Sequence, residues 1–225
     1  MSEVILAYIF DNECDHIAPM GTLYMGTYLQ NHGISVSVFN FILDKSGQLK
    51  ENELEKFKAE LKGCICVGIS VMTIQTPKSL LLTNLVKSIN PDIKIVWGGV
   101  HPTLFPEQTL ENKNIDFIVM KEGEKPLLEL VTKLKSGKID FEKIEGLGFK
   151  KNGKIIKNKM PPMFDEFTEI MPNWELIEDF LKANNGFTMA GNHYRYAEIL
   201  TGKGCPYRCN YCINAILYGK TRRTR

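Results

Sequence analysis

The chain has 225 residues, of which 44% are hydrophobic and 24% charged, and its formal net charge is +2. These values are typical of a globular protein long enough for one full domain and part of a second. The small charge argues against a nucleic-acid or acidic-substrate partner, and the basic end at 220–225 is interpreted as the start of an ordinary element. No apolar run approaches the about 20 residues of a membrane span, and no basic region precedes the first apolar run. We expect a cytoplasmic protein that contacts no membrane.

Apolar runs and helical periodicities alternate along the first 135 residues. The predicted strands are Val4–Phe10, Ser35–Phe41, Cys66–Met72, Lys94–Val100 and Asp116–Met120. The predicted helices are Pro19–His32, Glu51–Lys62, Lys78–Ile89, Pro106–Asn112 and Pro126–Leu134. This alternation predicts an α/β fold of the Rossmann or flavodoxin-like kind, an open parallel sheet with helices on both faces.

Ligands of such sheets bind outside the carboxyl ends of the strands. The loops at that edge are 11–18, 73–77, 98–103 and 122–125. They offer hydroxyls at Ser70 and Thr73, side-chain-free backbone at Gly98 and Gly99, and carboxylates in 122–124. The sequence therefore predicts a ligand site at this edge.

Three cysteines, Cys205, Cys209 and Cys212, lie within eight residues near the C-terminus. Thiolates favour iron–sulfur clusters, zinc or copper(I). A [4Fe–4S] cluster normally takes four cysteines, so a set of three leaves one iron open. A zinc site is the alternative, with His193 or Cys14 as fourth ligand. Two other cysteines at 64 and 66, in an apolar run, are interpreted as small buried hydrophobes.

Residues 199–204 followed by these cysteines resemble the first strand and cluster loop of radical S-adenosylmethionine (SAM) enzymes. The resemblance implies a [4Fe–4S] cluster held by Cys205, Cys209 and Cys212, with SAM on the open iron. It also places Tyr211 beside the adenine of SAM. A reducing partner such as a flavodoxin or ferredoxin would supply the electron.

Three N-terminal stretches resemble the cobalamin (B12)-binding domain that precedes many radical SAM barrels. They are Ala18-Pro-Met-Gly21, Trp97-Gly-Gly-Val-His101-Pro-Thr and Asp116-Phe-Ile-Val-Met-Lys-Glu-Gly-Glu124. The resemblance implies cobalamin contacts from Met20, Gly21, Ser70, Thr73, Gly98, Gly99, His101, Glu122 and Gly123. The corrinoid would lie on the carboxyl edge of the sheet, with its nucleotide tail running down into it. The Asp-x-His-x-x-Gly motif of some such domains has no match here, so we expect no histidine from that motif beneath cobalt.

We predict three segments: a cobalamin-binding-like domain at 1–140, a β-hairpin and linker at 141–185, and the start of a radical SAM domain at 186–225. The hairpin is indicated by 144–149 and by Asn152-Gly153, a strong turn signal. A short helix is expected at Trp174–Leu181 and the first barrel strand at Tyr194–Thr201. The sequence ends thirteen residues after Cys212, which indicates a truncated barrel and a chain that does not turn over alone.

The expected function is the N-terminal part of a cobalamin-dependent radical SAM enzyme that transfers methyl groups or performs related radical chemistry. One alternative is a non-catalytic module that binds cobalamin or another nucleotide. A second is a radical methylthiotransferase, whose N-terminal domain needs three further cluster cysteines. Only Cys14, Cys64 and Cys66 are available for that role. The substrate is not indicated by the sequence.

Overall fold

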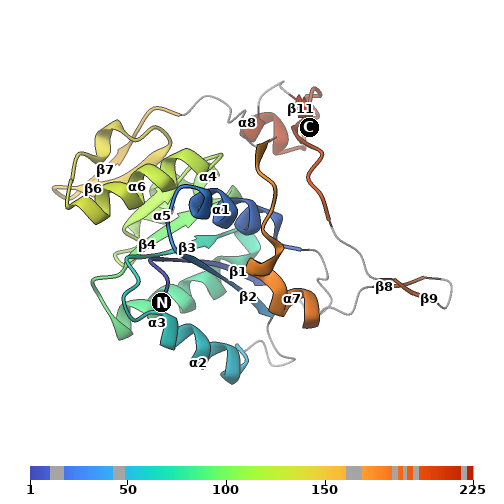
Figure 1. Ribbon diagram of the computed structural model, residues 1–225. Coiled ribbons are helices and arrows are strands. Elements are labelled where there is room, and N and C mark those ends of the chain that lie inside the picture. The colour runs from blue at the N-terminus through green and yellow to red at the C-terminus, as the bar shows by residue number, and fades with distance from the viewer. Residues whose placement is uncertain are drawn as a thin grey trace.

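The computed structural model describes residues 1–10, 18–42, 49–160, 169–183, 187–189, 192–194, 198–218 and 222–224. Its centre is a seven-stranded sheet in the order β2-β1-β3-β4-β5-β6-β7 (Figure 1). The strands are β1 (Val4–Phe10), β2 (Val36–Ile42), β3 (Cys66–Ser70), β4 (Lys94–Gly98), β5 (Phe117–Val119), β6 (Leu147–Lys151) and β7 (Lys154–Lys157). The first five are parallel, and β6 and β7 extend the sheet antiparallel. This confirms the predicted α/β fold class.

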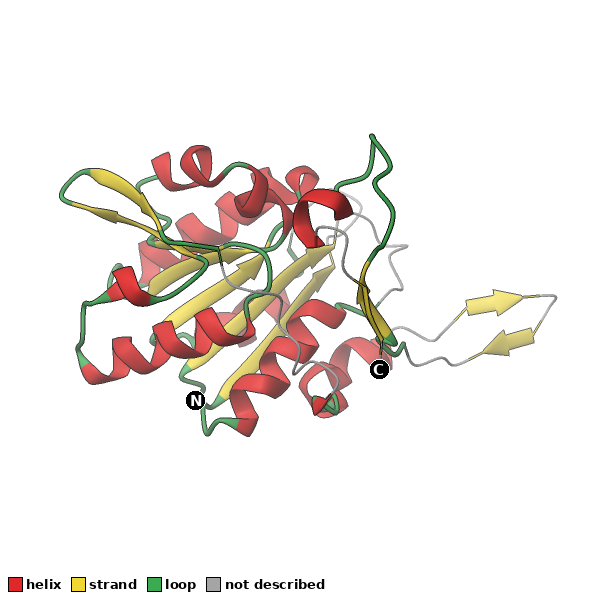
Figure 2. Ribbon diagram, turned by 90° about the horizontal axis from the view of Figure 1, so that it is seen from above, coloured by secondary structure: helices red, strands yellow, loops and turns green. Residues whose placement is uncertain are grey.

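Helices cover both faces of the sheet (Figure 2). The major helices are α1 (Met20–Asn31), α2 (Glu51–Glu60), α3 (Thr76–Ile89), α5 (Pro106–Glu111) and α6 (Glu124–Ser136). Buried side chains of α2, α3 and α5 pack on one face, and those of α1 and α6 pack on the other. The strands are apolar on both sides because both faces are covered, as the continuous apolar runs predict.

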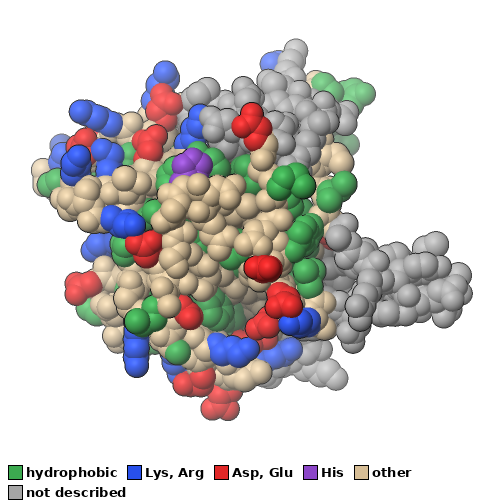
Figure 3. Space-filling model, in the orientation of Figure 1, with side chains coloured by type: hydrophobic (Ala, Val, Ile, Leu, Met, Phe, Trp, Pro, Cys, Tyr) green, Lys and Arg blue, Asp and Glu red, His purple; other side chains and the backbone are tan. Residues whose placement is uncertain are grey.

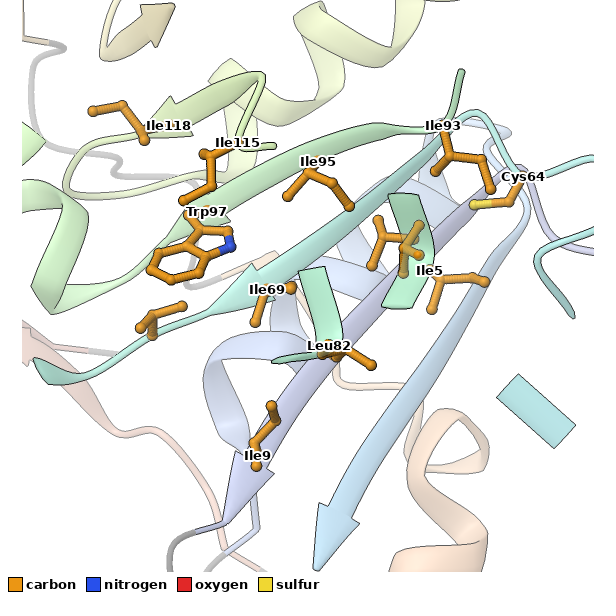
Figure 4. Packing of buried hydrophobic residues seen from close by; sticks show 14 of the residues in the cluster. Ile5, Ile9, Cys64, Ile69, Leu82, Ile93, Ile95, Trp97, Ile115 and Ile118 are labelled. Carbon is orange, nitrogen blue, oxygen red and sulfur yellow. The ribbon is translucent and has the colours of Figure 1, made fainter. Parts of the chain in front are cut away.

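The larger core cluster lies between the sheet and α3 (Figure 4). Ile5, Ile69 and Ile95 project from three neighbouring strands toward Leu82 of α3. The indole nitrogen of buried Trp97 donates a hydrogen bond to the hydroxyl of Thr83, at 3.0 Å. This bond satisfies the polar atom of a large side chain that otherwise packs among hydrocarbons.

The predicted hairpin is confirmed. Asn152 and Gly153 have positive φ angles of 50° and 74°, as a two-residue turn between twisted strands requires. Strand β6 pairs with β5 through Phe117 opposite Phe149, so the hairpin completes one edge of the main sheet. Residues 141–157 therefore add to the N-terminal fold rather than to a separate body.

The segment after the hairpin returns to α1. It forms η4 (Trp174–Ile177) and α7 (Glu178–Ala183), which correspond to the expected short helix. The backbone nitrogen of Asn173 donates to the hydroxyl of Thr27 at 2.9 Å. The rings of Phe10 and Phe180 stack with centroids 5.1 Å apart. These contacts cover the β2 side of the sheet.

The prediction of a first barrel strand at Tyr194–Thr201 is wrong for 198–201, which form no strand, and Tyr194 instead ends a short hairpin strand. The nearby strands are β9 (Asn192–Tyr194), which pairs with β8 (Phe187–Met189), and β10 (Gly202–Gly204). Strand β10 pairs antiparallel with β11 (Arg222–Thr224), and α8 (Asn214–Tyr218) lies between them in the chain. A strand forms where a neighbour satisfies its backbone groups, and β11 provides that neighbour for β10.

Three further short elements differ from the sequence prediction. Residues Val100–Leu104, expected to form a loop, make the short helix α4, because Gly99 turns the chain directly after β4. Residues Thr73–Gln75 form the single turn η1 before α3, and Phe141–Lys143 form η2. The loop predicted at 11–18 lies almost entirely outside the described residues.

The surface is mixed in charge. On the face in Figure 3, acidic and basic side chains stand side by side around the rim. Within the described ranges, no helix combines the length and the apolar character needed to cross a membrane.

The Thr83–Trp97 bond gives a first prediction. Thr83→Val keeps the shape of the side chain but leaves the buried indole N–H without its acceptor, which should lower the free energy of unfolding by about 1–3 kcal/mol. The matched control is Thr132→Val, since the Thr132 hydroxyl bonds only to an exposed carbonyl of its own helix. Its effect should stay within about 0.5 kcal/mol. Urea unfolding with an unchanged m-value checks both, and equal losses would contradict the role of the buried bond.

Candidate functional site

A cavity of about 330 Å³ opens at the carboxyl ends of the parallel strands, between α1 and α6. Its floor consists of Leu6, Gly68, Val96 and Val119, one residue from each of β1, β3, β4 and β5. Strand order reverses between β1 and β3, so the chain leaves these two strands toward opposite faces of the sheet. This switch point is where open parallel sheets bind their ligands.

Gly68 keeps the floor of the cavity open. It lies opposite Leu6 in the sheet register. A Cβ atom at position 68 would approach the Cδ2 atom of Leu6 to 2.9 Å. Glycine inside a strand weakens the strand and marks a place where another group comes close. The cavity therefore depends on a missing side chain in the middle of the sheet.

The turn after β4 also requires glycine. Gly99 has φ 93° and ψ −159°, a conformation that is essentially restricted to glycine. A Cβ atom there would lie 3.1 Å from both the nitrogen and the carbonyl oxygen of Val71. The neighbouring Gly98 is different, because its Cβ would meet nothing closer than 3.8 Å.

One hydroxyl joins the two loops that follow β4 and β5. Thr103 donates to the carbonyl oxygen of Gly99 at 2.7 Å and accepts from the backbone nitrogen of Lys121 at 2.8 Å. Lys121 lines the cavity with φ 63°, a left-handed conformation that is unfavourable for a lysine. The hydrogen bond from its amide helps to hold that conformation.

Two carboxylates face the cavity beside Gly123. A Cβ atom on Gly123 would approach the Cε atom of Met25 to 2.7 Å, so α1 and this loop pack closely. Glu124 begins α6 and is buried. Its Oε1 atom lies 2.6 Å from the Nζ atom of Lys203, which is also 3.4 Å from Oε1 of Glu122. The glutamates thus meet a cation from the segment that precedes the cysteines.

Most of the predicted cobalamin contacts line this one cavity. They are Met20, Gly21, Ser70, Gly98, Gly99, Glu122 and Gly123. The sequence places them on four separate loops and helix starts, and the sheet brings them together because parallel strands end at the same edge. Their roles as ligand contacts remain predictions.

Thr73 and His101 do not line the cavity. Thr73 is exposed at the start of η1, and its hydroxyl lies 3.3 Å from Nδ1 of the buried His101. The His101 ring packs near Trp97 and Phe105. Burial lowers the pKa of His101, which keeps the imidazole neutral near pH 7. The short helix α4 accounts for the position of His101, because none of Val100–Leu104 lines the cavity.

The C-terminal thiols are accessible but not gathered. Cys209 is exposed, and Cys205 and Cys212 are partly so. In the described part of the chain, no three cysteine, histidine or acidic side chains come together as a metal site. The backbone nitrogen of Cys212 bonds to the carbonyl oxygen of Cys209, which makes a tight turn. Of the alternative zinc ligands, Cys14 and the side chain of His193 lie outside the described residues.

The remaining candidate residues, Tyr211, Cys64 and Cys66, do not line the cavity. Tyr211, predicted to contact SAM, is 93% exposed and touches no part of the cavity. Cys64 and Cys66 are buried, and burial raises the pKa of the Cys64 thiol to about 11. Burial raises the pKa of Cys66 further, so both thiols stay protonated. This confirms their interpretation as small buried hydrophobes.

Several residues of the cavity were not predicted. They are Leu6, Thr22, Tyr24, Met25, Gly68, Ile69, Val96, Val119, Lys121, Leu127, Leu200, Lys203 and Tyr218. Gly68 alone carries a signal in the sequence, since a single glycine interrupts an apolar strand. The apolar residues look like any other core positions, and Lys203 is distant in sequence from the glutamates that it meets.

The sequence family described as the B12 binding domain matches residues 15–131. This match covers about half of the chain and includes every parallel strand except β1. The chain belongs to the B12 binding domain family.

Curated proteins are similar to most of this chain. An uncharacterized methyltransferase of Pyrococcus horikoshii is 28% identical over 209 residues, covering 91% of this chain and 42% of the relative. An anaerobic magnesium-protoporphyrin IX monomethyl ester cyclase of Synechocystis is 29% identical over 200 residues, covering 88% and 38%. The chain thus spans less than half the length of these relatives.

Solved structures share the fold. The cobalamin-dependent SAM radical enzyme OxsB, with aqua-cobalamin and SAM bound, matches with a TM-score of 0.73 and 22% identity over 94% of this chain and 28% of that one. The radical SAM methyltransferase TsrM of Kitasatospora setae, with cobalamin and a [4Fe-4S] cluster bound, matches with a TM-score of 0.66 and 20% identity over 100% and 44%.

The cavity of this B12-binding domain suits a small-molecule group that packs on an apolar floor and meets a few polar groups. Its volume falls in the range of small-molecule sites, and glycines let the backbone approach the ligand. Ser70, Lys121 and the glutamates offer polar groups at the rim. The residues present therefore fit the nucleotide tail of a corrinoid.

The turn at Gly99 gives a prediction on stability. Gly99→Ala should lower the free energy of unfolding by about 1–3 kcal/mol, because alanine tolerates neither the φ angle nor the contact with Val71. Gly98→Ala is the matched control and should change it by less than about 1 kcal/mol, since its Cβ has ordinary contacts. Thermal or urea unfolding of the two variants decides between them, and an equal effect would show that the turn is not strained for alanine.

Proposed function

We propose that this chain is the cobalamin-binding part of a cobalamin-dependent radical SAM enzyme, in which the complete protein transfers a methyl group or performs related radical chemistry. The observation that carries the proposal is the cavity with a glycine floor at the switch point of a B12-binding domain. The names of the relatives, which include methyltransferases and a cyclase, support the reaction class.

In this proposal the corrinoid ring lies over the carboxyl edge of the sheet, and its nucleotide tail enters the cavity. Gly68 provides depth, and Gly98 and Gly99 allow the backbone to approach the tail. The Ser70 hydroxyl at the end of β3 offers a hydrogen bond, and Met25 of α1 forms an apolar wall. When bound, cobalamin supplies the chemistry of methyl carriage. The chain's own residues orient it and shield its tail from water.

The cysteines form the second half of the proposal. Cys205, Cys209 and Cys212 are the proposed ligands of a [4Fe–4S] cluster, with SAM at the open iron and Tyr211 beside its adenine. Their donor type and spacing fit such a cluster. Among the described residues their sulfurs are not gathered into a metal site. The cluster would supply an electron to SAM.

A non-catalytic cobalamin-binding module is the second candidate. It is favoured by one observation, namely that most of the residues lining the cavity belong to the B12-binding domain and none of them is a cysteine. The radical methylthiotransferase alternative is disfavoured. It needs three further cluster cysteines, and two of the three available ones, Cys64 and Cys66, are buried, protonated thiols rather than accessible ligands.

Corrinoid binding tests the proposal. Hydroxocobalamin titrated into the chain should shift its absorption bands and bind at one site per chain. Gly68→Val should weaken binding at least about tenfold, since the added side chain occupies the floor and collides with Leu6. Ile95→Val, which loses one methyl group on the opposite face of the neighbouring strand, should retain the affinity within about threefold. A wild-type chain that does not bind, or a Gly68→Val variant that binds normally, would overturn the assignment of the cavity.

Cluster content tests the second half. After anaerobic reconstitution with iron and sulfide, the wild-type chain should show a broad thiolate-to-iron band near ~400 nm. The Cys205/Cys209/Cys212→Ala variant should lose the band and its iron while corrinoid binding persists. A Cys64→Ala variant is the control and should retain the band, because that thiol is buried. Corrinoid binding with no band in the wild-type chain would favour the non-catalytic module.

A further inference from the structure

The wall of the cavity comes from two distant parts of the sequence. Leu200, Lys203 and Tyr218 line it together with the residues of the B12-binding domain. Leu200 and Lys203 precede the three cysteines in the sequence, and Tyr218 follows them. A single glycine separates Lys203 from Cys205. The segment 198–218 therefore both carries the cysteines and forms part of the wall.

The segment contacts the domain through Leu200 and through Lys203. Leu200 packs against the cluster formed by Tyr24, Tyr28 and Ile170. Lys203 lies in β10, and its ammonium group contacts both glutamates of the loop after β5, at 2.6 Å from Glu124 and 3.4 Å from Glu122. One attachment is apolar and the other is ionic.

The ionic attachment is well shielded from water. The side chains of Lys203, Glu122 and Glu124 are 14%, 9% and 5% exposed. By comparison, the surface pair of Lys56 and Asp179 is 69% and 84% exposed. Removing one partner of a buried ion pair leaves an uncompensated charge in a poorly solvated place, whereas exposed pairs contribute little. Lys203 is thus suited to hold one arrangement of the segment.

We propose that Lys203 is a positioning residue whose ion pair with Glu124 and Glu122 docks the cysteine-bearing segment against the cavity, so that filling the cavity and docking the segment favour each other. The coupling follows from geometry, because a ligand in the cavity touches a wall that exists only while the segment is docked. Such linkage is reciprocal: a ligand that stabilises the docked segment is itself bound more tightly when the segment is docked. The coupling rests on the proposed corrinoid function, while the docking contact does not.

Variants that reverse the charges of Lys203 and Glu124 test the docking contact without a ligand. Hydrogen–deuterium exchange of the backbone at 198–204 should accelerate at least about tenfold in Lys203→Glu and in Glu124→Lys, since each places like charges together. The double variant, Glu124→Lys with Lys203→Glu, restores the opposite pair with the same net charge and should return within about threefold of wild type. Lys56→Glu is the control at an exposed pair and should leave exchange at 198–204 unchanged. Exchange in β3 reports whether each variant is folded.

Hydroxocobalamin titration tests the coupling. The ligand should slow exchange at 198–204 in the wild-type chain, and Lys203→Glu should weaken its binding at least about threefold, with recovery in the double variant. Unchanged exchange in both single variants, or no recovery in the double variant, would overturn the docking contact. Normal corrinoid affinity in a Lys203→Glu chain with an undocked segment would overturn the coupling. A wild-type chain that binds no corrinoid would overturn both the coupling and the proposed function, and the exchange data would still decide the docking contact.

Discussion

The structure depends on the place where the strand order of the sheet reverses. β1 and β3 are neighbours, yet the chain leaves them toward opposite faces, with α1 packing on one side and α3 on the other. Helices that diverge in this way cannot cover the ends of both strands, so a gap remains at their carboxyl edge. The cavity is this gap, deepened by the absence of a side chain at Gly68. The residues that we propose to hold the corrinoid are arranged around it.

Keeping the gap open has a local energetic cost. Gly68 gives up a side chain in the middle of a buried strand, and Gly99 takes a conformation that other residues avoid. Lys121 holds a left-handed conformation at the cavity wall. These unfavourable features are offset by the covered core on both faces, where Trp97 and its neighbours are fully buried. Concentration of such features at one edge is typical of a binding site within a stable scaffold.

The segment near the cysteines connects the two halves of the proposed function. Glu122 and Glu124 belong to the B12-binding domain, while Lys203 immediately precedes the cysteine motif. A shielded ion pair between them places the proposed cluster ligands at the same edge as the proposed corrinoid. A radical enzyme that uses both cofactors needs them near one another, and this contact is one physical means of arranging that.

The sequence by itself determined the fold class and seven of the residues that line the cavity. Continuous apolar runs such as Val4–Phe10 indicate strands covered on both sides, and alternating strands and helices lead to a parallel sheet whose loops meet at one edge. Tertiary structure alone decided the rest. Leu6, Val96 and Val119 form the cavity floor because their side chains lie on the same face of the sheet. Helix α4 places His101 outside the cavity. Lys203 contacts glutamates that lie about 80 residues earlier in the sequence. Periodicity and propensity report local preferences, whereas these placements follow from contacts between parts of the chain that are distant in sequence.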